Sequence, residues 1–515
     1  MLAIVNSCCV IGLINHIVRV EVDVSNGLPY FEIVGLPDTS VRESRDRVRT
    51  ALKNSGFDFP LHRITVNLSP GNLKKEGPMY DLPIAIGILA ATGQVDTTSI
   101  TDKVFVGELS LNGEILDVSG VLVMTDSLSR ESGKTNYSLV TSVNNGKEGA
   151  IINNISVYGF PTIPALVEFI SGNHSIEPVI YNPNSVEVSQ PSLDYKDVNG
   201  QFEAKRALEI AAGGLHNIIM SGPPGSGKTM LAERFNTILP KLSNEEKIQI
   251  TKIYSVAGLL PVKSPLITKR PFIAPHHTCS LASMVGGGKF PKPGLLSLAS
   301  YGVIFLDELP EFSRDILESL RQPLEEHQLK IARLSTAVTY PANFQLIAAL
   351  NPCPCGYHGH PNKPCTCSSI QQARYLKKIS GPLLDRIDIQ IQLPPVEFEQ
   401  LYSASQSKSS TSQEIQSRVI KARERQQSRW SQYDAPYLAN GLVSSLQLKK
   451  EITLTKECRQ LLKTAFIKLN LTARSHDKIL RIALTIADLD NSDSISVDHI
   501  SEAIQFRRLD HQWTN

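Results

Sequence analysis

Gly222-Pro-Pro-Gly-Ser-Gly-Lys228-Thr229 decides the fold of this chain, because a glycine-rich run of this form joins a strand to a helix around bound phosphate groups. An apolar stretch at 217–220 precedes it, and a helix-like segment follows it. The loop N–H groups then surround the phosphates, Lys228 reaches the β- and γ-phosphates, and the Thr229 hydroxyl ligates Mg²⁺. The predicted ATP-binding residues are Gly222, Pro223, Pro224, Gly225, Ser226, Gly227, Lys228 and Thr229.

A second motif, Gly302-Val-Ile-Phe-Leu-Asp307-Glu308, predicts a buried strand of a parallel sheet that ends in two acids. Ligands of such sheets bind at the carboxyl ends of the strands. We therefore expect Asp307 to hold the Mg²⁺ shell and Glu308 to orient and polarise the attacking water. The alternative is that both acids are solvated turn residues.

A third apolar strand, 344–350, ends in Asn351, whose amide can bridge the water and the γ-phosphate, or can be a turn residue before Pro352. With Gly381-Pro-Leu-Leu-Asp-Arg386 downstream, this order of motifs resembles an AAA+ ATPase. Arg270-Pro-Phe-Ile-Ala-Pro-His-His and Val285-Gly-Gly-Gly-Lys-Phe-Pro-Lys-Pro-Gly resemble the signatures of the magnesium-chelatase-like branch.

The resemblance extends beyond these motifs. Ile33-Val-Gly-Leu-Pro, Asp81-Leu-Pro-Ile-Ala-Ile-Gly and the closing Gln505-Phe-Arg-Arg-Leu-Asp are similar to the ComM/YifB family of bacterial proteins, and the matches run over essentially the whole chain. The resemblance implies a homo-hexameric, DNA-stimulated ATPase with a Lon-protease-like N-terminal domain. For the ComM type it implies a helicase that promotes branch migration during homologous recombination and natural transformation.

Two arginines receive roles from this resemblance alone. It makes Arg386 the finger that reaches the γ-phosphate of a neighbouring subunit, where its fixed cationic fork stabilises transition-state charge. It makes Arg474 the arginine that reports the nucleotide state to a helical lid. The alternative for either is a structural ion pair, and Asp385 and Asp388 are close enough in sequence to pair with Arg386.

The fold class is α/β, an AAA+ P-loop core flanked by two other parts. Residues 1–170 alternate like strands around one helix, 38–55, and resemble the Lon-type α+β domain. Met79 or Tyr80 takes the serine position of that domain and Met124 the lysine position, so Ser-Lys proteolysis is not expected. A linker at 171–193, an ATPase core at 194–395 with a cysteine insertion at 353–367, and a helical lid at 396–515 complete the predicted chain.

Composition favours a globular protein over a membrane or secreted one. The 515 residues, 41% hydrophobic, suffice for two or three cores. The amino terminus has no signal-peptide pattern, and no apolar run reaches the length of a membrane span, so we expect a cytoplasmic protein without membrane contact. The net charge of +2 does not favour nucleic acid, so any DNA contact must come from local patches.

Four of the eight cysteines lie close together as two C-x-C pairs, in a loop rich in glycine and proline. In a reducing compartment this density of thiolates favours a closed tetrahedral Zn²⁺ site over disulfides; free thiols or a redox pair are the alternatives. His358 and His360 are spare ligands. The predicted zinc ligands are Cys353, Cys355, Cys365 and Cys367.

Contacts to single-stranded or branched DNA are expected from two segments. Lys289 and Lys292 lie in a glycine- and proline-rich stretch typical of a pore loop, while Lys330 and Arg333 lie in one arm of a predicted hairpin, 328–340. Such cations track a phosphate backbone without reading sequence, although solvated loop charges are the alternative. We expect a solvated face for the basic helix around residues 421–429.

Two further questions stay open at this stage. His276 and His277 can contact phosphate or zinc, or can simply form a polar turn before the pore loop. The motor itself can act on DNA or, alternatively, as a chelatase- or MoxR-like ATPase that remodels a protein or metallocofactor partner. Stimulation of ATP turnover by DNA distinguishes these two functions.

Overall fold

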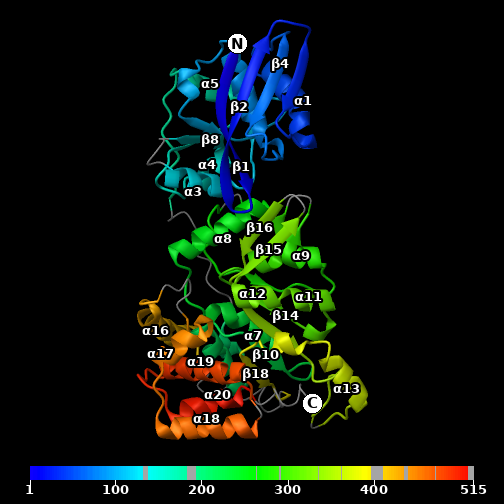
Figure 1. Ribbon diagram of the computed structural model, residues 1–515, viewed down its shortest axis with the longest axis vertical. Coiled ribbons are helices and arrows are strands. Elements are labelled where there is room, and N and C mark those ends of the chain that lie inside the picture. Colours follow the sequence, from blue (N-terminus) through cyan, green and yellow to red (C-terminus); the bar gives the residue numbers. More distant parts are fainter. Residues whose placement is uncertain are drawn as a thin grey trace.

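The computed structural model describes residues 1–131, 137–182, 193–261, 264–288, 291–333, 336–360, 362–395, 410–433, 439–469 and 471–507. These residues form three parts (Figure 1). A strand-rich N-terminal part lies at one end of the longest axis of the molecule. A second α/β part, the middle part, extends from the centre to the other end, where a bundle of C-terminal helices lies beside it.

The N-terminal part is built on a sheet of seven strands within the described residues, in the order β3-β4-β2-β1-β5-β8-β9. Valines at alternate positions, 18, 20 and 22, are fully buried, which is the period-2 pattern of a strand with one face on a core. The strands are β1 (Leu2–Ile11), β2 (Ile14–Ser25), β3 (Tyr30–Val34), β4 (Arg63–Ser69), β5 (Lys103–Phe105), β8 (Ser138–Ser142) and β9 (Val157–Phe160).

Helices pack around this sheet, and the central one, α2 (Asp81–Ala91), is buried along its whole length. The others are α1 (Thr39–Asn54), α3 (Val121–Glu131), α4 (Val143–Gly149) and α5 (Ile163–Ile170), with a small hairpin of β6 (Glu108–Leu109) and β7 (Ile115–Leu116). Met79 and Met124 pack in the same apolar cluster. These two methionines are therefore part of the apolar packing of the N-terminal part.

The middle part is a parallel sheet in the order β11-β14-β17-β10-β18 among the described residues. All residues of β10, β14 and β17 are buried, as expected for strands covered on both faces. The strands are β10 (Ile218–Ser221), β11 (Phe272–Ile273), β14 (Val303–Leu306), β17 (Gln345–Leu350) and β18 (Ile389–Gln392). The predicted strands at 217–220, 303–306 and 344–350 are confirmed.

Helices and two hairpins surround this sheet. The helices are α6 (Phe202–Gly214), α7 (Lys228–Arg234), α8 (Asn244–Ala257), α9 (Leu281–Val285), α10 (Leu295–Leu298), α11 (Arg314–Ser319), α12 (Arg321–Glu326), α13 (Ser369–Leu376) and α14 (Gly381–Leu384). The hairpins are β12 (Gly286–Gly287) with β13 (Lys292–Pro293), and β15 (Gln328–Arg333) with β16 (Thr336–Pro341). The predicted hairpin at 328–340 is confirmed.

The C-terminal helices pack on α6 and on the end of β18. They are α16 (Ser412–Trp430), α17 (Ser445–Glu451), α18 (Lys456–Lys468), α19 (Ala473–Leu489) and α20 (Val497–Gln505). The prediction of a solvated basic face on α16 was wrong for its arginines. Arg423 donates to the Ala212 carbonyl and Arg429 to Asp488, so these side chains attach α16 to its neighbours.

The N-terminal and middle parts contact each other through α8 and the β15–β16 hairpin (Figure 1). The Lys252 ammonium lies 2.6 Å from an Asp126 carboxylate oxygen, and the Ser255 hydroxyl donates to Glu148 at 2.5 Å. Ile11 and Leu13, at the turn between β1 and β2, pack against the hairpin. The two parts are thus joined by buried polar and apolar contacts.

The predicted α/β class is confirmed, with a parallel sheet at its centre. Part of the predicted linker, residues 183–192, and the first residues of the predicted lid, 396–409, lie outside the described residues. Among the helices that the structure describes, none combines the length and the apolar character needed to cross a bilayer.

Candidate nucleotide site and cysteine centre

The glycine-rich loop leaves the carboxyl end of β10 and enters α7. Gly222 donates its N–H to the Leu350 carbonyl at 3.2 Å, so the loop starts anchored to the neighbouring strand β17. Gly225 and Gly227 have φ values of +79° and +89°, a conformation that side chains other than glycine rarely adopt. These glycines bend the loop so that it opens at the start of α7, where N–H groups and the helix dipole attract anions.

Lys228 is buried at the first position of α7. Its ammonium donates to the carbonyls of Gly222 (2.7 Å) and Pro223 (3.0 Å) and to the Asn351 side chain (3.2 Å). Burial lowers the pKa of Lys228, and the nearby Asp307 and Glu308 carboxylates partly oppose that shift. The side chain is therefore held inside the loop, within reach of bound phosphate.

Thr229 and Asp307 meet across the site, since the threonine hydroxyl donates to an Asp307 carboxylate oxygen at 2.9 Å. Hydroxyl and carboxylate oxygens are the ligands that Mg²⁺ prefers, usually together with waters and substrate phosphates. The pair predicted to hold Mg²⁺ is thus in contact, although the two residues are far apart in sequence.

Glu308 follows β14 in the left-handed region, with φ +51°, which is uncommon for a residue other than glycine. Its carboxylate is 54% exposed, and one of its oxygens lies 3.8 Å from His277 Nδ1. The His277 ring is tilted by 32° against the His276 ring, with ring centres 4.2 Å apart, and it meets Phe312 edge-on. An accessible carboxylate beside an imidazole fits a group that activates water.

Asn351 directly follows β17, which pairs with β10, the strand that leads into the phosphate loop. Its side-chain oxygen accepts from Lys228, and its backbone N–H lowers the pKa of the Tyr375 phenol beside it. Burial raises the pKa of Tyr375, so this phenol stays protonated. The structure therefore brings together five of the predicted site residues: Lys228, Thr229, Asp307, Glu308 and Asn351.

Arg386 and Arg474 lie in a second cluster. Arg386 is 11% exposed; it pairs with Glu325 at 2.6 Å and donates to the carbonyls of Arg321 and Pro382. Arg474, which is 67% exposed, lies 3.8 Å from Asp385. The partner of Arg386 is thus Glu325 and not Asp385 or Asp388, the two acids that its sequence position suggested.

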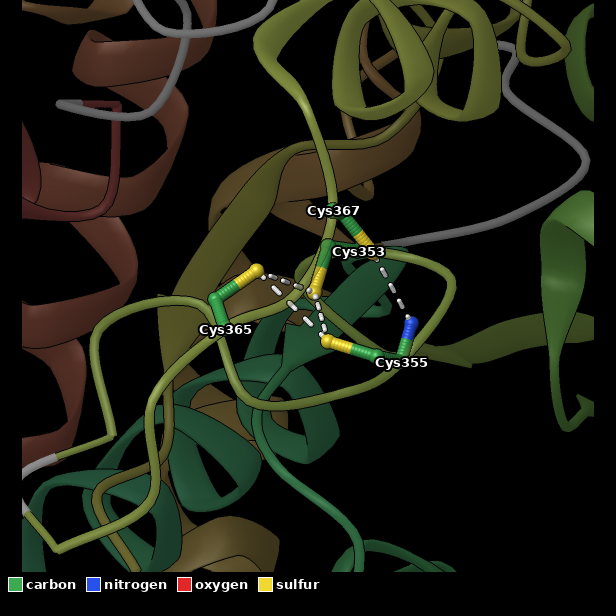
Figure 2. Close-up of side chains that lie close together, drawn as sticks. All are labelled: Cys353, Cys355, Cys365 and Cys367. Carbon is green, nitrogen blue, oxygen red and sulfur yellow. Dashed lines mark hydrogen bonds between the residues drawn. The ribbon is translucent and has the colours of Figure 1, made fainter.

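The four clustered cysteines converge on one point (Figure 2), and their sulfur atoms all lie within 4.8 Å of one another. Cys353 Sγ is 3.4 Å from Cys355 Sγ and 3.6 Å from Cys365 Sγ, and the last two are 3.5 Å apart. A tetrahedral site with Zn–S bonds of ~2.3 Å places sulfur atoms about 3.8 Å apart. The donor set and its spacing therefore fit Zn²⁺.

The cysteines of the centre differ in acidity. Backbone N–H donation, chiefly from Tyr357, lowers the pKa of Cys355 to about 5, whereas burial raises the pKa of Cys353 to about 12. His360 does not join the sulfur cluster, because its Nδ1 accepts from the N–H groups of Asn362 and Lys363. All four ligands are thus cysteines in the part of the chain that the structure describes.

Two of the cations predicted to contact DNA lie on neighbouring hairpins. Lys292 in β13 and Lys330 in β15 are exposed, and the Tyr340 hydroxyl of β16 donates to the Pro291 carbonyl at 2.7 Å. Lys330 pairs with Glu326 at 3.4 Å. Lys289 and the side chain of Arg333 lie outside the described residues.

Sequence reasoning did not assign three contacts of the site. It left His277 between phosphate, zinc and a polar turn, and it did not consider Glu325 or Tyr375. His277 follows β11, the strand that pairs with β14, and this position was the signal for it. The carboxyl ends of adjacent parallel strands lie at the same edge of a sheet. Glu325 and Tyr375 gave no signal, because only the folded chain brings them to their partners.

Comparison with known proteins agrees with this geometry. Residues 194–401 match the family described as magnesium chelatase, subunit ChlI; residues 20–142 match subunit ChlI of Mg-chelatase; and residues 409–507 match the C-terminal part of magnesium chelatase subunit ChlI. A magnesium-chelatase 67 kDa subunit of Heliobacterium mobile is 26% identical over 200 residues, which is 33% of this chain and 29% of the relative.

Two relatives match nearly from end to end. The uncharacterized protein YifB of Salmonella typhimurium is 40% identical over 512 residues, covering 99% of this chain and 97% of the relative. The competence protein ComM of Haemophilus influenzae is 40% identical over 516 residues, covering 99% and 98%. With its nucleotide loop, paired acids and parallel sheet, this chain belongs to the ComM/YifB family of magnesium-chelatase-like AAA+ proteins.

Proposed function

We propose that this protein is an ATP-driven DNA motor, a cytoplasmic homo-hexamer that promotes branch migration as a helicase in recombination. The observation that carries the proposal is the placement of exposed Lys292 and Lys330 on two hairpins that contact each other, in the same α/β part as the ATP site. The name of the competence protein ComM, a relative along nearly the whole chain, supports a role in competence.

In this proposal the ATP-site residues have the roles that their motifs predict, and the contacts within the site support them. Lys228 neutralises phosphate charge, Thr229 and Asp307 hold Mg²⁺, and Glu308 orients the attacking water. Asn351 bridges that water and the γ-phosphate. Arg386 acts on the nucleotide of the next subunit once it leaves Glu325, and Arg474 links the nucleotide to the C-terminal helices, which then serve as the lid.

The cations on the hairpins track the phosphate backbone of single-stranded or branched DNA. Charge neutralisation without base readout suits branch migration, in which the sequence changes at every step. Lys289 and Arg333 belong to the same proposed set through their places in sequence.

The cysteine centre holds Zn²⁺ in this proposal, with all four thiolates as ligands. Bound zinc supplies a closed structural crosslink between residues 353–355 and 365–367. Its thiolates require a reducing compartment, which accords with the cytoplasm.

ATP turnover measured with and without DNA tests the proposal. We expect single-stranded and four-way-junction DNA to raise turnover, and Glu308→Gln to bind ATP without hydrolysing it. Lys330→Ala with Arg333→Ala should abolish the rise, while turnover without DNA persists. The slope of a plot of log affinity for single-stranded DNA against log salt concentration should become less steep by about 0.7 for each phosphate contact that is lost.

Lys449→Ala with Lys450→Ala is the matched control, because it removes the same charge from exposed positions on α17. This control should keep the full response to DNA. If no DNA raises ATP turnover, the result favours the alternative function. In that function a chelatase- or MoxR-like ATPase remodels a protein or metallocofactor partner. That alternative is favoured by the family match of residues 194–401 and by the chelatase relative.

A further inference from the structure

The cysteine centre lies directly beside the ATP site. Cys353 is buried and stands two residues after Asn351, which directly follows the end of β17. The same strand end accepts the Gly222 N–H through the Leu350 carbonyl. Whatever fixes Cys353 therefore also restrains the end of β17 and the start of the phosphate loop.

A second contact joins the cysteine loop to the phosphate loop. Gly356 has φ +84° and donates its N–H to the Cys353 carbonyl at 2.9 Å. A Cβ atom placed on Gly356 would lie 2.7 Å from Cδ of Pro224 and 3.9 Å from Cγ of Asn351. The backbone beside Cys355 thus lies flat against the proline of the nucleotide loop, where no side chain fits.

Helix α13 supplies a third route between the two sites. Gln372 donates to Cys365 Sγ at 3.5 Å and to the Cys367 carbonyl at 3.3 Å. One turn later, the buried Tyr375 lies close enough to the Asn351 backbone for that N–H group to lower the pKa of the phenol. The two C-x-C pairs therefore reach the ATP site independently, one through Gly356 and the other through α13.

We propose that the four-cysteine metal centre is a positioning element for ATP hydrolysis, a role that rests on the ATPase and zinc assignments above. Bound metal joins the two pairs, so that Gly356 stays against Pro224 and Tyr375 stays on Asn351. Without metal the two segments separate, and Asn351 loses its place relative to Lys228. A displacement of about 1 Å in such a group costs up to ~100-fold in rate.

The first test uses two glycines of the same loop. Gly356 and Gly359 both have positive φ, +84° and +75°, but a Cβ on Gly359 meets no atom within 4 Å. Both alanine variants carry the same kind of backbone strain and retain all four cysteines. We expect Gly356→Ala to lower kcat about ten- to hundred-fold at normal zinc content, with Gly359→Ala close to wild type. Equal kcat values for the two variants would overturn the proposal.

The second test removes the metal from the full-length protein. Zinc content, affinity for a fluorescent ATP analogue, and hydrogen exchange at residues 222–229 are measured for wild type and Cys365→Ser. Where folding of the variant suffers, wild type treated with a chelator replaces it. We expect loss of zinc to raise exchange in the phosphate loop and to lower kcat by a larger factor than it lowers nucleotide affinity, since Asn351 acts on the water.

The outcomes separate the two proposals. If wild type binds zinc but never hydrolyses ATP, the ATPase proposal fails, and loop exchange and nucleotide affinity still decide the positioning role. If metal-free protein keeps wild-type exchange, affinity and kcat, the positioning role is wrong and the ATPase proposal stands. Wild type that carries no zinc as purified and gains neither metal nor protection on adding it would also overturn the positioning role.

Discussion

His277 lies next to the Glu308 side chain, with its Nδ1 atom 3.8 Å from a carboxylate oxygen. This imidazole competes with water for the group that is proposed to activate water. It also lies in the segment that leads from β11 to the β12–β13 hairpin and Lys292. If the hairpin binds DNA as proposed, its movement would withdraw His277 and release Glu308.

We predict that His277→Ala raises ATP turnover without DNA by up to about ten-fold, the kinetic equivalent of ~1.4 kcal/mol, and reduces the further gain on adding DNA. Steady-state ATPase assays with and without single-stranded DNA provide the measurement. His276→Ala is the matched control, because His276 bonds to Thr278 and its variant leaves the imidazole beside Glu308 in place. A fall in basal turnover in His277→Ala would instead make this histidine a support for the carboxylate.

At the scale of elements, the sequence predicted those structures whose pattern is local. The buried strands of the central sheet, the phosphate loop and helices such as α18 follow from apolar runs and turn residues. The arginines of α16 were misjudged because their partners, Ala212 and Asp488, come from other segments. Charge along one helix does not reveal whether another element supplies the counter-charge.

The junction of β18 with α19 offers a test at this scale. Asp388 is buried between Lys478 (3.2 Å) and His216 (3.4 Å). We predict that Asp388→Asn lowers the free energy of unfolding by about 3–5 kcal/mol, since it leaves Lys478 buried without its counter-ion. Denaturation followed by the fluorescence of Trp430 in α16, in a Trp513→Phe background, measures this cost. A loss below about 1 kcal/mol would contradict it.

Acid should reduce the contribution of Asp388 to the free energy of unfolding. Burial alone would raise the pKa of Asp388, but Lys478 and His216 outweigh burial and hold it well below the usual range. A depressed carboxyl pKa stabilises the fold above the unfolded value of about 3.9 and loses that contribution as the pH falls below it. Wild type should therefore lose stability more steeply than Asp388→Asn on acidification below about pH 4.

At the scale of the whole molecule, the sequence predicted the order of the parts but not how they meet. Ile11 and Leu13 are ordinary apolar residues in sequence, yet they pack on the hairpin that carries Lys330. The turn between them also contacts this hairpin, since Cβ on Gly12 would lie 2.5 Å from Val338. Contacts between distant segments depend on the relative placement of two folded units, which periodicity does not encode.

The ion pair between Lys252 and Asp126 should hold the N-terminal part on α8. The two side chains are 7% and 18% exposed, so Asp126→Ala leaves a nearly buried ammonium without its partner, a change that typically costs about 3–5 kcal/mol. Arg130→Ala is the control: this residue also pairs with Asp126, but it is 71% exposed, and such surface pairs contribute about 0–1 kcal/mol. Hydrogen exchange at α3 and α8 should rise sharply in Asp126→Ala and little in Arg130→Ala, while the buried α2 stays protected in both.

If α3 and α8 keep their protection in Asp126→Ala, the ion pair is dispensable. The contacts of Glu148 with Ser255 and of the β1–β2 turn with the hairpin then suffice to join the two parts.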